Sequence, residues 1–253
     1  MKQYMMRYEI KNKAKDKLMG KYSILILGSF LFSLMNAAVL FIFAFPYITS
    51  VMASAFTGAG LNTSAFRFYQ AGTFVTQILS GFLRFGIAYL CLNIVCGNTY
   101  SYKDVFFGFR RENLLKTLIL SAASVLTDTI CLTPWQYFAA SYLETRDTLQ
   151  LVITVLALII GVCIYIPVGL ALNLTYYLLL DFPEKGATEI IKDSFRVIKG
   201  HRKRFFLLQC SFLPLYLLCQ LSFGIGFLWL SPYMYMTFVL FYLDLMNPKE
   251  TNA

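Results

Sequence analysis

The sequence predicts an all-α membrane protein with six transmembrane helices arranged as three hairpins. The chain is 58% hydrophobic and only 14% charged over 253 residues, whereas soluble domains are about 45–50% apolar and about 25% charged. Long apolar runs recur along the chain, and the basic residues gather in alternate connecting segments. A soluble protein of this size is too small to enclose so many uninterrupted apolar helices, so we expect a single integral membrane domain over residues 1–253.

Each predicted span is an apolar run of roughly 20 residues or more, the length that crosses a hydrocarbon core about 30 Å thick. The runs are 24–48, 74–96, 117–138, 149–180 and 205–245. The last run is long enough for two crossings, and Gly224-Ile225-Gly226 supplies the break between them. Pro167 predicts a kink or tilt in the fourth span, which Asp181-Phe182-Pro183 then ends. Aromatic residues are expected at the outer membrane surface, namely Trp135, Tyr137, Trp229 and Tyr233.

The basic residues orient these spans. Nineteen of the 22 Lys and Arg residues lie before the first span, between spans two and three, between spans four and five, or in the tail. The opposite connections hold only Arg67 and Arg146, and Arg84 lies inside a span. The positive-inside rule therefore places both termini in the cytoplasm. The first run is longer than the 7–15 apolar residues of a cleavable signal peptide, so we expect it to be retained as a span.

A short amphipathic helix is predicted before each odd-numbered span. The first segment ends near Gly20, and the second contains Gly108. The third covers residues 187–199 and ends before Gly200. Ser101 and Asp104 have the spacing of a capping box at the start of the second segment. The shared spacing around the glycines suggests a threefold unit of interfacial helix and hairpin, over residues 1–98, 99–181 and 182–253, although chance similarity between amphipathic linkers explains it almost as well.

The residues from Asp181 onward also carry a family resemblance. The chain resembles a family of multi-spanning membrane proteins of Gram-positive bacteria known only as a domain of unknown function. The matching positions are Asp181, Pro183, Gly186-Ala187, Ser194, Gly200, Gly224, Gly226, Pro232-Tyr233 and Phe241-Tyr242, with Ala14, Leu18 and Gly20 near the N-terminus. Pro214 and Leu215 depart from the family pattern within the fifth predicted span. The resemblance implies six spans in a bacterial cell membrane, and it brings no catalytic residue.

Enzyme and metal signatures are missing from the sequence. The six cysteines lie within apolar runs, without a C-x-x-C pair or a neighbouring histidine, so helix packing is the favoured interpretation. No Ser/His/Asp set, zinc-protease motif, P-loop or Rossmann glycine pattern occurs. We therefore expect no catalytic residue, no cofactor and no metal. Nucleic acid is also not expected as a partner, because no basic stretch belongs to a recognisable binding module.

Polar residues inside the spans form the first candidate site. Arg84, Asp128 and Asn36 each lie about 12 residues from the predicted cytoplasmic end of their span. A charge at the bilayer centre costs at least about 2.5–3.5 kcal/mol, so an ion pair between Arg84 and Asp128, with Asn36 nearby, is predicted. Such a pair either fixes helix register or lines a polar cavity for an anionic or zwitterionic ligand. The self-neutralising structural role is favoured.

The basic cytoplasmic segments form the second candidate site. Basic residues beside an anionic leaflet gain about 1 kcal/mol each, and the candidate headgroup contacts are Lys192, Arg196, Lys199, Arg202, Lys203 and Arg204. The leading hypothesis is a non-enzymatic protein that engages membrane lipids, another membrane protein or a second copy of itself through these helices. A small transporter or flippase for an amphiphilic or anionic molecule is the rival, and an immunity-type membrane protein is a third possibility.

The orientation can be tested by labelling introduced cysteines in intact cells, on a cysteine-free background. We expect a membrane-impermeant maleimide to leave cysteines at Lys13 and Lys249 unlabelled until the cells are opened, because both positions belong to the basic side. A cysteine at Arg67 on the opposite side is the positive control. Labelling from outside at Lys13 or Lys249 would show that the orientation is wrong.

Overall fold

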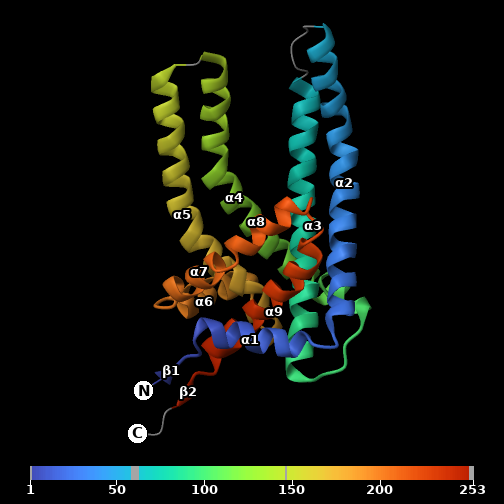
Figure 1. Ribbon diagram of the computed structural model, residues 1–253, viewed down its shortest axis with the longest axis vertical. Helices are drawn as coiled ribbons and strands as arrows, with labels where there is room; N and C mark the ends of the chain where they lie inside the picture. The colour runs from blue at the N-terminus through green and yellow to red at the C-terminus, as the bar shows by residue number, and fades with distance from the viewer. Residues whose placement is uncertain (1, 58–62, 146, 251–253) are drawn as a thin grey trace.

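The computed structural model describes residues 2–57, 63–145 and 147–250. Its elements are β1 (Lys2–Gln3), α1 (Arg7–Leu18), α2 (Tyr22–Thr57), α3 (Thr63–Cys96), the 3-10 helix η1 (Tyr102–Phe109), α4 (Arg111–Thr145), α5 (Thr148–Asp181), α6 (Ala187–Ile198), α7 (Arg202–Cys210), α8 (Leu213–Leu221), α9 (Phe227–Met246) and β2 (Lys249–Glu250). The short strands β1 and β2 pair antiparallel. They lie with α1 at the lower end of the molecule in Figure 1, which we call the basal end.

Two tall hairpins, α2–α3 and α4–α5, dominate the molecule (Figure 1). Their helices contain 36, 34, 35 and 34 residues, or about 50 Å each at 1.5 Å per residue. They are longer than the predicted spans, because backbone hydrogen bonds continue a helix past the end of an apolar run. Arg67, predicted in a connection, is therefore inside α3. Arg146, its predicted companion, is outside the described residues.

Five segments of the described chain are long and apolar enough to cross a membrane. They are Tyr22–Thr57, Ser64–Cys96, Arg111–Ala139, Thr148–Asp181 and Arg202–Leu221. The fifth segment comprises α7 and α8, and α9 is not among the five. The most apolar windows of α2 and α5 are only 17% and 11% buried inside the protein. Such exposed apolar helices indicate a membrane-embedded protein.

The third helix pair differs from the predicted hairpin. The chain breaks at Ser211 and Phe212 between α7 and α8, which have nine residues each, and Pro214 follows in the first turn of α8. Helices of nine residues extend only about 14 Å. In Figure 1, α8 lies obliquely at about mid-height between the tall hairpins, and α9 lies below it.

The position of this pair corrects part of the predicted aromatic belt. Trp229 and Tyr233 line one apolar pocket together with Tyr22, which begins α2. Lys15 of α1 also lies over the Tyr233 ring, with 5.9 Å between its ammonium nitrogen and the ring centroid. Trp229 and Tyr233 therefore lie near the start of α2 and not at the outer end of the tall hairpins, because the breaks around α8 turn the chain back early.

The three predicted amphipathic segments form α1, η1 and α6. The buried residues of α1 are Ile10, Ala14 and Leu18, and those of α6 are Ala187, Ile190, Ser194 and Ile198. Both helices thus direct their apolar faces into the protein core. The second segment is a 3-10 helix, and its predicted capping box is present: the Ser101 amide donates to Asp104 at 2.8 Å.

The glycines of the suggested repeat do not share one role. Gly20 and Gly200 follow α1 and α6 with φ angles of +75° and +91°, a conformation that glycine adopts without steric cost. Gly108 instead lies inside η1, where an added Cβ would be 2.5 Å from the Phe82 carbonyl oxygen. The first and third segments therefore end in the same way, whereas the second segment, η1, is packed closely around its glycine.

The hydrophobic core occupies the basal half of the molecule. It contains the lower part of α3, the last turns of α5, and most of α9, with α1 packed beneath. At its basal edge, Arg204 forms an ion pair with Asp244, which is only 2% exposed at its side chain. Asp244 also accepts from the Met5 amide at 3.1 Å, and Arg204 donates to the Met5 carbonyl at 2.6 Å. This pair thus joins α7, α9 and the N-terminal segment.

Two glycines bring α3 into backbone contact with its neighbours. A Cβ on Gly86 would be 1.8 Å from the Val105 carbonyl oxygen of η1, and one on Gly81 would be 2.0 Å from the Ser121 hydroxyl of α4. Real Cβ atoms do not approach other heavy atoms this closely, so any larger residue would push η1 or α4 away. The close packing of α3 therefore depends on glycine at both positions.

We expect Gly86→Ala to lower the free energy of unfolding of the detergent-purified protein by about 1–3 kcal/mol, because the new methyl group overpacks a backbone contact. The change is measured as a lower melting temperature. Gly186→Ala is the matched control, because nothing lies within 4 Å of a Cβ at Gly186. Equal melting temperatures for the two variants would contradict the close contact between α3 and η1.

Candidate functional site

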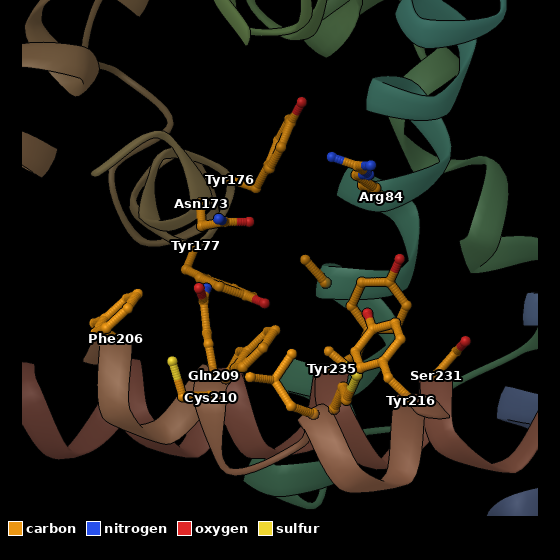
Figure 2. A pocket seen from close by; sticks show the side chains of 14 residues that line it. Arg84, Asn173, Tyr176, Tyr177, Phe206, Gln209, Cys210, Tyr216, Ser231 and Tyr235 are labelled. Atoms are coloured by element: carbon orange, nitrogen blue, oxygen red, sulfur yellow. The ribbon is translucent and has the colours of Figure 1, made fainter. Parts of the chain in front are cut away.

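A cavity of about 430 Å³ surrounds Arg84, and we call it the Arg84 cavity. Its lining residues come from α3, α5, α7, α8 and α9: Arg84, Ala88, Asn173, Tyr176, Tyr177, Phe206, Gln209, Cys210, Leu213, Tyr216, Ser231, Met234, Tyr235 and Phe238. Figure 2 shows Arg84 facing Tyr176 and Asn173 across the cavity, with Gln209 and Tyr235 along another wall.

The local structure explains why Arg84 reaches this cavity. Its neighbours Leu83 and Phe85 are each only 1% exposed, whereas Arg84 itself is exposed. Asn173 is similarly exposed between buried residues of α5. Both residues line the cavity. Arg84 lies 12 residues before the end of α3 at Cys96, about 18 Å along the helix axis.

A smaller cavity of about 80 Å³ adjoins the first and contains Asp128. The two cavities share Arg84, Asn173 and Tyr176 in their linings. The Tyr165 hydroxyl is within hydrogen-bonding reach of the Asp128 carboxylate. The structure therefore places Arg84 and Asp128 in one polar region.

The predicted direct ion pair between Arg84 and Asp128 is not formed. In the described chain, the ion pairs within 4.0 Å are Lys185–Asp193, Arg196–Asp193 and Arg204–Asp244. Arg84 and Asp128 interact at longer range. The Asp128 carboxylate has the Tyr165 hydroxyl as its hydrogen-bond partner instead. Arg84 is thus left without a carboxylate in contact.

Asn36 belongs to a different contact. Its side-chain oxygen accepts from the Ser80 hydroxyl at 2.7 Å, and its amide nitrogen donates to the Phe32 carbonyl at 2.9 Å. Asn36 lines neither of the two cavities. It joins α2 to α3, so its predicted proximity to the Arg84–Asp128 region is corrected to a helix-packing role.

Sequence reasoning missed most of the polar lining. Five tyrosine side chains lie within electrostatic range of Arg84: Tyr165, Tyr176, Tyr177, Tyr216 and Tyr235. Asn173 and Gln209 add amide groups. The amides interrupt apolar runs just as Arg84 does, so they could have been identified by the same argument. The tyrosines could not, because tyrosine is common at membrane surfaces and in packed cores.

The six predicted headgroup residues fall into two groups. Lys192, Lys199, Arg202 and Lys203 are exposed. Arg196 is exposed but pairs with Asp193 at 3.0 Å, and Arg204 is committed to Asp244. The carboxylate of Asp193 has a lowered pKa, because Lys185 donates a hydrogen bond to it and Arg196 lies close by. Four of the six residues thus present free surface, whereas Arg196 and Arg204 each have a carboxylate partner within the protein.

Metal-binding groups were also sought among the described residues. No cluster of three or more His, Cys, Asp or Glu side chains that could hold a metal ion occurs there. All six cysteines are free thiols, and Cys91, Cys131 and Cys219 are buried. The chemistry available at the Arg84 cavity is therefore that of one cation, several phenol groups and two amides.

The fold and the cavity define a helical, membrane-embedded protein with a polar site between its helices. The chain belongs to a family described as protein of unknown function (DUF975), whose model matches residues 4–249. The resemblance to an uncharacterised family is thereby confirmed over nearly the whole chain. No curated protein and no solved structure matches it.

A double-mutant cycle tests the separation of Arg84 and Asp128. We expect Arg84→Leu and Asp128→Leu to lose stability almost additively, with a coupling free energy of about 1 kcal/mol or less, because the two groups are not in contact. Arg84→Leu combined with Asp16→Asn on exposed α1 is the additive control. A coupling of about 3–5 kcal/mol, typical of a broken buried pair, would show that the two charges meet in the membrane.

Proposed function

We propose that this protein is a non-enzymatic transporter or flippase that binds the anionic headgroup of an amphiphile in the Arg84 cavity. The observation that carries the proposal is a cation in a cavity of about 430 Å³ that no carboxylate of the described residues contacts. Ligand sites of about 300–1,000 Å³ with a few convergent polar groups are typical of small-molecule binding. An arginine paired with a carboxylate would need no ligand to balance its charge. Arg84 forms no such pair with a described residue.

The electrostatics of the cavity favour an anion. A guanidinium group in a poorly solvated site attracts negative charge strongly, since it forms charge-assisted hydrogen bonds with phosphate or carboxylate oxygens. The surrounding phenol and amide groups are neutral donors that can satisfy further oxygens. Asp128 lies in the adjoining cavity, where its carboxylate would favour the cationic part of a zwitterionic headgroup.

The surroundings of the cavity favour an amphiphile over a simple ion. Phe206, Leu213, Met234 and Phe238 contribute apolar lining. The neighbouring helix α8 exposes Leu217, Leu218 and Leu221 by 60% or more, which is the expected surface for contact with acyl chains. A headgroup could therefore occupy the polar region while its chains remain in the bilayer. This arrangement suits movement of a lipid-like molecule between leaflets.

For topology, we infer that the basal end faces the cytoplasm of a bacterial cell. The segments α1, α6 and the start of α7 carry ten of the 22 basic residues, and Figure 1 places these elements together in the lower part of the molecule. Four crossings by the tall hairpins, with α7–α9 entering only part of the bilayer, would return both termini to one side. This count satisfies the positive-inside rule and differs from six full spans.

A second role is supported by the exposed basic side chains. Lys192, Lys199, Arg202 and Lys203 form a basic surface at the basal end, where each would gain about 1 kcal/mol beside anionic lipids. We infer that this surface attracts anionic headgroups to the membrane beside the protein. The apolar face of α6 is already buried, so the helix contacts lipid through its charged edge rather than by inserting.

Thiol protection tests headgroup binding. In a variant with Cys96→Ser and Cys163→Ser, the remaining accessible thiol is Cys210, which lines the cavity. In vesicles we expect phosphatidylglycerol to slow N-ethylmaleimide labelling of Cys210 roughly tenfold when it exceeds its Kd about tenfold. Neutral phosphatidylcholine should give little protection, because it lacks the net negative charge that Arg84 attracts.

Arg84→Gln should abolish the protection, and Arg67→Gln, which removes one charge from an exposed position on the same helix, should retain it. Transport is measured separately, as the rate at which a fluorescent phosphatidylglycerol in the inner leaflet becomes accessible to dithionite. Protection that is equal in the parent and in Arg84→Gln would refute headgroup binding. Protection without any lipid movement would leave a binding protein and refute the flippase.

A further inference from the structure

A second cavity lies at the basal end, apart from the proposed transport site. It has a volume of about 800 Å³ and lies between the N-terminal segment, the start of α1 and α7. We call it the basal cavity, and its lining residues are Tyr4, Met5, Met6, Arg7, Tyr8, Lys11, Arg204 and Ser211. It shares no residue with the Arg84 cavity.

The lining of the basal cavity carries three cations and no carboxylate. The nearest acidic groups are already engaged, since Asp244 pairs with Arg204 and accepts from the Met5 amide. Glu9 accepts from the Met6 amide at 2.8 Å and from the Tyr8 hydroxyl at 3.4 Å. In the described chain, neither Arg7 nor Lys11 belongs to an ion pair.

Lys11 shows the effect of this excess positive charge. Its ammonium group donates to the Ser211 carbonyl at 3.1 Å and lies 4.1 Å from the centroid of the Phe212 ring. Burial and the neighbouring charges of Lys15 and Arg7 lower the pKa of Lys11. An anion bound nearby would offset the like-charge repulsion that these groups share.

We propose that the basal cavity binds a phosphate group through Arg7, Lys11 and Arg204. A phosphate has several acceptor oxygens and up to two negative charges, so it can engage more than one cation at once. Arginine is suited to phosphate because its donors form a planar fork. The phenol group of Tyr4, which lines the same space, supplies a further donor.

The phosphate could belong to a lipid headgroup at the membrane surface or to a free anion in the cytosol, because the same groups recognise both. Inorganic phosphate, titrated calorimetrically into the detergent-purified protein, tests the free anion. Native mass spectrometry after exposure to phosphatidylglycerol or to a neutral galactolipid tests the lipid. Binding in either arm supports the site and identifies the source of the phosphate.

Arg7→Gln is the deciding variant, because Arg7 is exposed and its loss should leave the fold intact. We expect its affinity for phosphate or phosphatidylglycerol to fall about tenfold, the loss expected for one charge-assisted hydrogen bond. Lys13→Gln, on the same helix and exposed away from the cavity lining, is the matched control and should change affinity less than about twofold. Melting temperatures verify that both variants fold.

Two results would overturn the proposal. The first is an equal loss in Arg7→Gln and Lys13→Gln, which would mean that only the overall charge of α1 attracts the anion. The second is that neither inorganic phosphate nor phosphatidylglycerol binds the parent protein more tightly than chloride or the galactolipid, respectively.

Discussion

The backbone contact between α3 and η1 is the constraint on which the site depends. Gly86 allows the Val105 carbonyl to approach α3, and Gly81 admits the Ser121 side chain. Arg84 lies between these two glycines, so the same close packing that seals its neighbours Leu83 and Phe85 fixes the direction of its own side chain. An arginine on a freely rotating helix could snorkel to the membrane surface. Here the helix is held, and the charge stays beside the cavity.

Much of the fold could be predicted from the sequence because membrane spans need long apolar runs. The four helices of the tall hairpins, the end of α5 at Asp181 and the turn around Gly224 all agree with local sequence signals. The third helix pair could not be predicted in the same way, because hydropathy does not report whether an apolar segment crosses or turns back. Pro214 was the sequence signal for an irregular segment, and the break falls just before it.

The candidate site was only partly predictable. The two charges were identified because a charge in an apolar run is costly wherever it occurs. Their contact was not predictable, since equal depth along two helices says nothing about how the helices are rotated. Asn36 shows this clearly: it has the same depth as Arg84, yet it bonds to Ser80 instead. The tyrosine-rich lining depends on five helices meeting, which no local pattern records.

The contact of Lys11 with the break between α7 and α8 has a mechanical consequence. Ser211 accepts from Lys11, while the preceding Cys210 and the following Leu213 line the Arg84 cavity. Helix α1 is thus coupled through one side chain to the wall of a site on another level of the molecule. The position of α1 and the position of the backbone between Cys210 and Leu213 are thereby fixed relative to each other.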